Sequence, residues 1–315
     1  MPGAYAHLTL VNLLREPARL EAIPGFPDEA ISAVLEYFRF TELGAVSPDY
    51  PYLVIGDSNA LKWADDMHYT NTNAVIYAGV DILKKMDGET KRKALAWLFG
   101  YTAHVATDVT IHPIIEIKVG KYAENKRAHR ECEMHQDAYI FQRMNLGEVG
   151  LSKHLDSGIA RCGEQSDKQR LDSDIVALWD EMLKRVYGEQ YAANPPDIKK
   201  WHQAFMLVLD TIAKEGDRLV PLARHVAVGA GLTYPAANAI DRNNFIDKLK
   251  VSHSPSPDAF LTYDVIFDRA VSNVCAMWDF IASGVFTGDT RYLAQIGDWD
   301  LDTGRDPNHN LAYWS

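Results

Sequence analysis

The sequence has few cysteines, a deficit of basic residues and no long uninterrupted apolar run. Only three of its 315 residues are cysteines, and none forms a CxxC pair, so we expect free thiols rather than a disulfide framework. The formal net charge of −11 argues against stable nucleic-acid binding, which needs a basic face. No segment approaches the ~20 apolar residues that span a bilayer. The N-terminus also lacks the basic start of a signal peptide, so we expect a cytoplasmic protein, although a leader removed earlier is compatible with the sequence.

Two familiar metal-site motifs are absent as well. There is no HEXXH sequence, which excludes the zinc proteases built on that helix motif. There is also no contiguous His-Asp pair, so the metal phosphohydrolases that depend on this dipeptide do not fit. Strand signals are almost absent apart from a short YLVIG segment at 52–56.

The periodicity that is present is helical, and it predicts an all-α fold. We expect one multi-helix domain over residues 1–315, because no repeat or low-complexity linker divides the chain. Residues 41–70 read as irregular because they contain Gly44, Pro48, Pro51 and Gly56. Pro113 is expected to end the helix that precedes it. The predicted helices cover 6–15, 27–40, 72–86, 89–112, 126–144, 170–187, 198–214, 235–249 and 258–284.

Polar residues recur at helical spacing within one apolar stretch, WLFGYTAHVATDVTIHP (97–113). His104, Asp108 and His112 are each four residues apart, so they form a ladder on one helix face with ~6 Å between rungs. A buried carboxylate needs a partner, and imidazole and carboxylate groups are ligands for zinc. Any single histidine of this kind is more often an ordinary core residue, but an Asp between two His can also bridge two ions.

A second ladder occurs in AHRECEMHQDAYI (128–140), where His129, Glu133 and Asp137 are again four apart. One helix cannot complete a metal site, so further ligands must come from elsewhere in the chain. Candidates upstream are Asp49 and His68, in the segment expected to be irregular, and His7 at the start.

Five motifs, in their order along the chain, carry a resemblance. AHLTLVN, GAVSPD, MHYTN, WLFGYTAHVATDVTIHP and HRECEMHQD together resemble the bacterial zinc-dependent phospholipase C family and the zinc-binding part of glycosylphosphatidylinositol-specific phospholipase D. The resemblance covers residues 1–145. In the helical remainder, 146–315, only GDWDLDTG (297–304) looks compatible with the family, and it suggests no role.

The resemblance implies the all-α fold of that family and a cluster of two or three Zn²⁺ ions. The first ion would take Asp49, His68, His104 and the bridging Asp108. The second would take His112, His129 and Glu133. The third would share Asp108, add His7 and be completed by the N-terminal residue. The chain departs from the family at this last point, because it begins Met1-Pro2.

The resemblance also implies a metal-dependent phosphoric diester hydrolase acting on a phospholipid or another small phosphodiester. Zinc-bound hydroxide would attack phosphorus in line, and Asp49 would accept the proton of the attacking water. Such a protein is compatible with transient contact with a membrane surface. Asp137 could accept a hydrogen bond that orients a ligand, or be an ordinary surface acid. Tyr50, Tyr52 and Trp63 could line a substrate cleft, or pack in the core.

Two alternatives stay open from the sequence. Related metal chemistry also serves single-strand nucleases and nucleotidases, although base recognition would need aromatic stacking. In a different class, the metal could simply stabilise a helical protein without catalysis.

Overall fold

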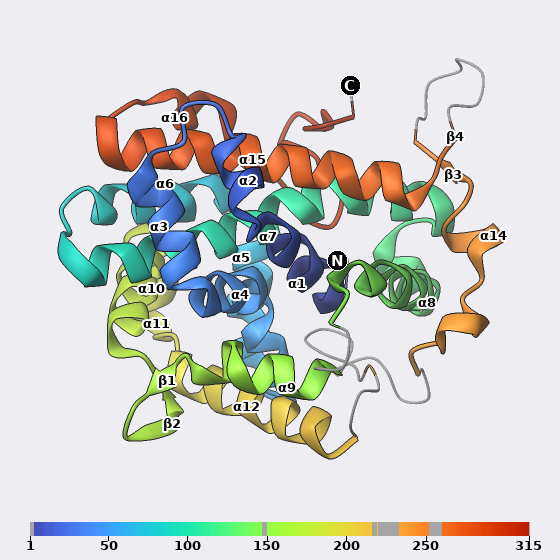
Figure 1. Cartoon of the computed structure of the whole chain (residues 1–315), viewed down its shortest axis with the longest axis horizontal. Coiled ribbons are helices and arrows are strands. Elements are labelled where there is room, and N and C mark those ends of the chain that lie inside the picture. Colours follow the sequence, from blue (N-terminus) through green and yellow to red (C-terminus); the bar gives the residue numbers. More distant parts are fainter. Residues whose placement is uncertain (1–2, 147–149, 216–218, 220–232, 252–259, 315) are drawn as a thin grey trace.

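The molecule is built from helices that surround one long central helix. The structure, a computed structural model, describes residues 3–146, 150–215, 219, 233–251 and 260–314. The central helix is α7 (Gly88–Val119), and every side chain from Ala94 to Ile115 on it is buried. α15 (Tyr263–Thr287) and α4 (Phe38–Val46) pack against α7, above and below it in Figure 1. The all-α prediction is confirmed.

Other helices and short hairpins complete the fold. The longer helices are α1 (Ala4–Leu14), α3 (Asp28–Glu36), α5 (Ser58–Tyr69), α6 (Thr72–Leu83), α8 (Tyr122–Ile140), α9 (Gly150–Ser157), α10 (Ser173–Val186) and α12 (Ile198–Glu215). The shorter helices are α2 (Pro17–Glu21), α11 (Gly188–Ala193), α14 (Arg242–Phe245) and α16 (Arg291–Gln295). The 3-10 helices are η1 (Ser47–Leu53), η2 (Phe141–Met144), η3 (Ile159–Arg161) and η4 (Ala237–Ala239). β1 (Gly163–Glu164) pairs antiparallel with β2 (Asp167–Leu171), and β3 (Leu249–Lys250) pairs antiparallel with β4 (Phe260–Leu261).

One continuous cluster of buried apolar side chains extends from Ala4 to Leu301. α15 is long and apolar enough to cross a membrane by length and composition alone, which the sequence analysis does not anticipate. In the structure this helix packs along α7, and its Phe267 and Trp278 side chains are completely buried. Its place in the core therefore accounts for the apolar side chains on the face that meets α7.

Two glycines allow α4 and α7 to cross in direct backbone contact. A Cβ on Gly44 would lie 2.1 Å from the carbonyl oxygen of Trp97, and a Cβ on Gly100 would lie 2.0 Å from that of Thr41. Neither position has room for a side chain. This close approach brings the end of α4 to the part of α7 that carries the first polar ladder.

The prediction that residues 41–70 are irregular is wrong. Helix α4 continues to Val46, η1 follows at once, and α5 covers most of the rest. Gly44 lies inside α4 because tertiary packing requires a glycine there, and Pro48 and Pro51 are accommodated in the 3-10 helix. The predicted helix over 27–40 is in turn divided at Tyr37, whose φ and ψ of −116° and 28° are not helical.

Two further helix predictions need correction. Pro113 does not end α7, which continues to Val119 with the proline inside it. The residues around Pro113 are buried, so packing keeps the helix continuous despite the lost hydrogen bond. A helix over 235–249 is also wrong, because the structure has only η4 and α14 there before β3 begins. In the predicted helix over 258–284, residues 258–259 lie outside the described part of the chain, and α15 begins at Tyr263.

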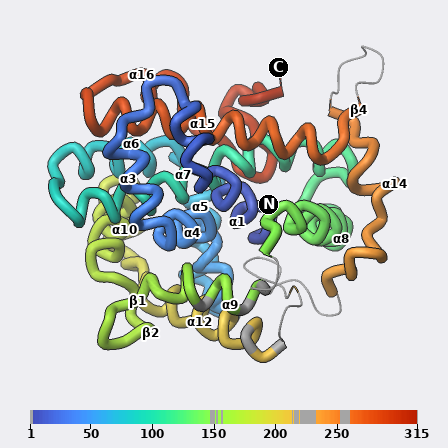
Figure 2. The backbone as a smooth tube through the Cα atoms, viewed as in Figure 1, coloured from blue at the N-terminus to red at the C-terminus, as the bar shows by residue number. Residues whose placement is uncertain are grey.

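The N-terminal helix lies in the middle of the molecule, whereas the C-terminal segment runs outward to the upper edge of the view in Figure 2. α1 lies in the centre beside α8, and the red C-terminal segment lies alongside α15 (Figure 2). α1 is buried along most of its length, including His7. The N-terminal helix therefore approaches the polar face of α7.

Candidate metal centre

Four elements bring five polar side chains together in the core. His7 comes from α1, Asp49 from η1 and His68 from the end of α5, and all three meet His104 and Asp108 of α7. Each of the five is at most 2% exposed. Their potential ligand atoms form two groups in which all atoms lie within 4.8 Å of one another: His7, His104 and Asp108 in one, and Asp49, His68 and His104 in the other.

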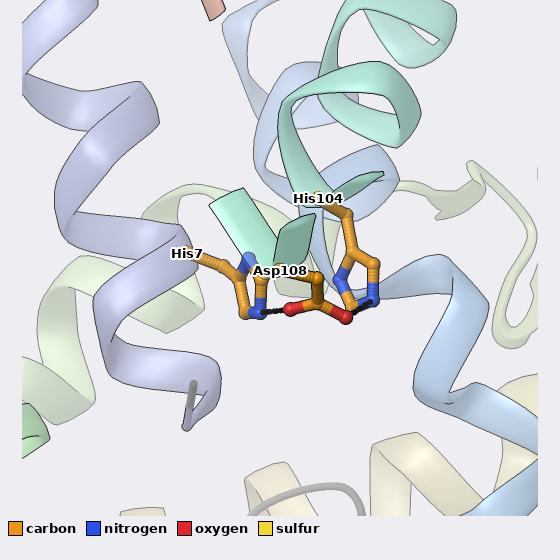
Figure 3. Close-up of side chains that lie close together, drawn as sticks. All are labelled: His7, His104 and Asp108. Atoms are coloured by element: carbon orange, nitrogen blue, oxygen red, sulfur yellow. Dashed lines mark ion pairs between the residues drawn. The ribbon is translucent and has the colours of Figure 1, made fainter. Parts of the chain in front are cut away.

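The Asp108 carboxylate lies between two imidazoles (Figure 3). Its Oδ1 is 3.2 Å from Nε2 of His7, and its Oδ2 is 3.3 Å from Nε2 of His104. The two imidazole rings are stacked, with centroids 4.2 Å apart. On the other side of His104, its Nε2 is 3.4 Å from Nε2 of His68, which is 3.5 Å from Oδ1 of Asp49. Nitrogen and oxygen atoms thus face a shared space from several directions.

Backbone carbonyls fix the orientation of four histidines. Each carbonyl accepts a hydrogen bond from one ring nitrogen, so the other nitrogen of a neutral ring keeps a free lone pair. Nδ1 of His68 donates to Ala64 O at 2.7 Å, and Nδ1 of His104 donates to Ala45 O at 2.9 Å. The remaining pairs are His112 Nδ1 with Leu301 O and His129 Nε2 with Gly120 O, both at 2.6 Å.

Several buried atoms of this cluster have no hydrogen-bond partner within the described residues. They are both oxygens of Asp108, Oδ1 of Asp49, both ring nitrogens of His7 and Nε2 of His112. An unsatisfied buried polar atom costs about 1–3 kcal/mol, and more when it is charged. Bound cations would satisfy these atoms, and the His and Asp donor set suits zinc. The residues present therefore fit the metal that the sequence analysis predicts.

The protonation states also favour a metal. Burial would raise the pKa of Asp108, but the adjacent His104 and His7 imidazoles outweigh it and hold that pKa well below its usual range. Burial lowers the pKa of His112 to about 3 and also lowers the pKa of His7. Ionised carboxylates and neutral imidazoles are the forms that bind metal ions, so Asp108, His112 and His7 are in suitable states. Burial would lower the pKa of His104, but the adjacent Asp108 carboxylate outweighs it and raises that pKa, so a cation must displace a proton from this imidazole.

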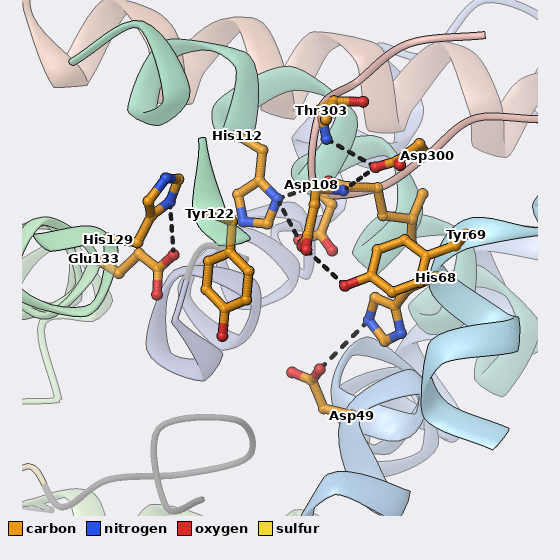
Figure 4. Close-up of polar contacts among 12 residues, drawn as sticks. Asp49, His68, Tyr69, Asp108, His112, Tyr122, His129, Glu133, Asp300 and Thr303 are labelled. Carbon is orange, nitrogen blue, oxygen red and sulfur yellow. Dashed lines mark hydrogen bonds and ion pairs between the residues drawn. The ribbon is translucent and has the colours of Figure 1, made fainter. Parts of the chain in front are cut away.

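The second predicted ligand group is less closely assembled. Nδ1 of His129 lies 3.9 Å from Oε1 of Glu133, and both side chains are buried. In Figure 4 this pair lies beyond His112, on the side away from Asp49. Among the described residues, His112, His129 and Glu133 do not form a group as tight as the two around His104. The third ion depends on the N-terminal residue, where the chain departs from the family. Met1 and Pro2 lie outside the described residues.

Asp137 acts on the helix that carries His7. Its Oδ1 accepts a hydrogen bond from the backbone N–H of Ala6 at 2.9 Å, and its Oδ2 accepts one from the hydroxyl of Tyr234, also at 2.9 Å. A Cβ on Gly3 would lie 1.8 Å from Oδ2, so only glycine fits at that position. Burial raises the pKa of Asp137 to about 7. The carboxyl group therefore secures the N-terminal turn of α1, through bonds to Ala6 and Tyr234 rather than to an imidazole.

Replacing Asp137 should weaken this attachment. We expect Asp137→Ala to lower the free energy of unfolding by about 1–2 kcal/mol, the cost of losing a helix N-cap, because the N–H of Ala6 and the hydroxyl of Tyr234 each lose their hydrogen bond to the carboxylate. Asp210→Ala, at an exposed position on α12, is the control and should change stability by less than about 0.5 kcal/mol. Urea unfolding measures both, and equal stabilities would contradict the assigned role.

The three aromatic residues considered for a substrate cleft are buried. Tyr50 stacks on Phe205 with ring centroids 4.4 Å apart, and Nε1 of Trp63 donates to Asn194 O at 3.0 Å. Both therefore occupy core positions, the alternative that the sequence left open. The ring of Tyr52 lies 5.4 Å from that of His68, so it packs beside a candidate ligand. None of the three lines the cavity described next.

A cavity of about 710 Å³ borders the polar cluster. Its wall residue Asp302 has Oδ1 3.6 Å from Nδ1 of His112. The ring of Tyr122, another wall residue, packs edge-on at 5.3 Å from His129. The other lining residues are Tyr69, Glu116, Lys121, Ala123, Asp298, Asp300, Thr303, Arg305, Asp306, Pro307 and His309. Eight of the thirteen lining residues lie between positions 298 and 309, and four of these eight belong to GDWDLDTG. The sequence shows this acidic segment without indicating its position in space.

Comparison with known proteins gives one positive result. The sequence model of the family described as zinc dependent phospholipase C matches residues 6–189, more than half of the chain. No curated protein and no solved structure matches the chain. The matched range contains every candidate metal-binding side chain named above, whereas the C-terminal wall of the cavity lies beyond it.

Proposed function

The chain belongs to the zinc dependent phospholipase C family, and from this premise we propose that it hydrolyses phosphodiester bonds in a phospholipid or a related small molecule. The observation that carries the proposal is Asp108. Its carboxylate is completely buried, lies between Nε2 of His7 and Nε2 of His104, and has no hydrogen-bond partner in the described structure. Such an arrangement is stabilised by cations.

The residues that would hold zinc are those of the two groups around His104. Asp49, His68, His104 and Asp108 would form one site, and Asp108 with His7 would contribute to another. His112, His129 and Glu133 would hold a further ion. When bound, zinc supplies Lewis acidity toward a phosphate and makes a nucleophile available from water near neutral pH.

The protein itself contributes a proton acceptor and a binding cavity. We assign the acceptor role to Asp49, whose Oδ1 is buried without a hydrogen-bond partner among the described residues. Burial opposes its ionisation, but the neighbouring His68 and His104 imidazoles keep its pKa below the usual value. It is therefore ionised at neutral pH and able to take up a proton.

The charge of the cavity suggests which part of a substrate it receives. Its lining contains five acidic residues against two basic ones, Lys121 and Arg305. The anionic phosphodiester would go to zinc, and an additional anionic group in the cavity would be repelled. We therefore expect zwitterionic phosphodiesters to be better substrates than those with an anionic headgroup.

Hydrolysis assays on zinc-loaded protein test the proposal. Short-chain phospholipids with zwitterionic and with anionic headgroups should be compared with a phosphomonoester and with single-stranded DNA. We expect release of diacylglycerol and the phosphorylated headgroup, loss of this activity with a chelator, and recovery with added zinc. Faster cleavage of DNA or of the monoester would favour a nuclease or nucleotidase. If zinc-loaded protein hydrolyses none of these substrates, the metal has a purely stabilising role.

A further inference from the structure

One backbone residue of the C-terminal segment links two candidate ligands that lie far apart in the sequence. The N–H of Leu301 donates to the carbonyl of His68 at 2.9 Å. The carbonyl of Leu301 accepts the hydrogen bond from Nδ1 of His112 at 2.6 Å, across 189 residues of sequence. Figure 4 shows that this segment reaches His112 from the side opposite α8. Leu301 itself is completely buried.

Side chains on both sides of Leu301 fasten the segment to α5 and α6. The hydroxyl of Tyr69 donates to Oδ2 of Asp302 at 2.6 Å. The backbone N–H of Thr72 donates to Oδ1 of Asp298 at 2.9 Å, and the hydroxyl of Thr72 accepts from the N–H of Trp299 at 2.9 Å. Position 301 is therefore held from both directions, which makes its carbonyl a fixed acceptor rather than an adaptable one.

A third attachment lies on α7 itself, one turn from His112. Pro113 has no N–H, so the carbonyl of Val109 lacks its usual helical donor. Gly304 packs at this point: a Cβ added to it would lie 2.6 Å from Val109 O and 2.5 Å from Cγ of Pro113. Gly304 also has a φ of +63°, which favours glycine. The proline inside the helix and the glycine of the C-terminal segment thus fit together.

We propose that residues 298–306, which lie beyond the range matched by the family model, are a positioning element of the metal centre. The carbonyl of Leu301 requires the proton of neutral His112 to be on Nδ1, so that the lone pair of Nε2 is available to the ion. The same residue holds the end of α5 that carries His68. This inference rests on the proposed zinc function. It assigns to the segment a role beyond forming one wall of the cavity.

The position of Nε2 supports this assignment. It is buried and has no hydrogen-bond partner in the described residues, as a nitrogen reserved for a metal would be. Partners that orient a ligand in this way commonly contribute 10–100-fold to metal affinity. A segment that served only to cover the core would have no need to bond to the ligand side chain.

Gly304→Ala, with Gly288→Ala as its matched control, tests the proposal. Both glycines have positive φ, +63° and +74°, so both substitutions cause similar backbone strain. Only a Cβ at position 304 meets α7, because nothing lies within 4 Å of one at position 288. Two quantities should be measured in each full-length protein: zinc affinity by chelator competition, and the His112 tautomer in the metal-free state by long-range ¹H–¹⁵N NMR.

We expect wild type and Gly288→Ala to bind zinc alike and to show His112 protonated at Nδ1. In Gly304→Ala, the zinc ion with the lowest affinity should bind about 10–100-fold less tightly than in wild type. The His112 side chain of this variant should no longer show a single tautomer. If Gly304→Ala does not fold, Tyr69→Phe, which removes the hydrogen bond from the Tyr69 hydroxyl to Asp302, replaces it with the same expected direction. Unchanged affinity and tautomer in a folded variant would overturn the inference while leaving the function intact. Failure of wild type to bind zinc would overturn the proposed function itself.

Discussion

Asp108→Asn should give a folded protein with almost no phosphodiester hydrolysis. The wild-type carboxylate faces an imidazole with each oxygen, at 3.2 and 3.3 Å. An asparagine offers one oxygen and an NH₂ group, so it has neither the charge nor the second acceptor needed to bridge two ions. Loss of a residue that only orients a metal ligand can lower activity by roughly 100-fold. Because Asp108 would itself bind the ions, we expect a larger fall in activity for Asp108→Asn.

The folded state of this variant must be checked separately. Asparagine has nearly the volume of aspartate, so packing in the core is conserved and circular dichroism should be unchanged. Asp210→Asn on the surface of α12 is the control, with full activity expected. Activity of Asp108→Asn within tenfold of wild type would contradict the bridging role. Complete loss of folding would instead favour a structural metal site.

Removal of zinc should destabilise the protein strongly. Buried oxygens of Asp49 and Asp108 then have no hydrogen-bond partner in the described structure, and their charges are compensated only by the imidazoles nearby. A ligand that binds only the native state adds about 2.7 kcal/mol of stability at 100 times its dissociation constant, and about 4.1 kcal/mol at 1,000 times. We expect a loss in this range when a chelator is present during urea unfolding, with recovery on adding zinc back. An unchanged unfolding midpoint would show that the cluster binds no zinc in the native state.

His112 should make the metal-free protein less stable in acid. Folding lowers the pKa of His112 from 6.5 to about 3, so below pH 6.5 the unfolded chain binds a proton that the folded chain does not. Between pH 6.5 and 5 this residue alone costs about 2 kcal/mol. The lowered pKa of His7 acts in the same direction, whereas the raised pKa values of His104 and Asp137 oppose it, and the lowered pKa of Asp108 acts only below this pH range. Urea unfolding of wild type and of His112→Gln at pH 7.5 and pH 5 with a chelator therefore isolates the contribution of His112. Wild type should lose about 2 kcal/mol more than the variant, and an equal loss in both proteins would contradict the expectation.

The ladder on α7 was predictable because helical spacing alone places His104 and Asp108 on one face. Local periodicity could not show which distant residues join them, and the inclusion of His7, Asp49 and His68 depended on the family resemblance. The structure places these three beside the ladder. The grouping of His112 with His129 and Glu133 is less tight in the structure and stays a prediction.

The errors over residues 41–70 and at Pro113 have a common physical cause. Glycine and proline were interpreted by their local preferences, as residues that break helices. Gly44 instead lies in α4 because the backbone of α7 approaches it there, and Pro113 lies inside a helix buried on all sides. Tertiary contacts outweighed local preference at both positions. The contribution of Leu301 could not be predicted at all, because it is made by a backbone carbonyl, which every residue has.

Anomalous X-ray diffraction at the zinc edge, from crystals of protein purified without chelators, tests the central claim most directly. We predict zinc peaks within bonding distance of Asp108 between His7 and His104, and among Asp49, His68 and His104, with about two or three ions in each chain. A structure without zinc at Asp108, in which water or protein groups satisfy its oxygens, would contradict the account.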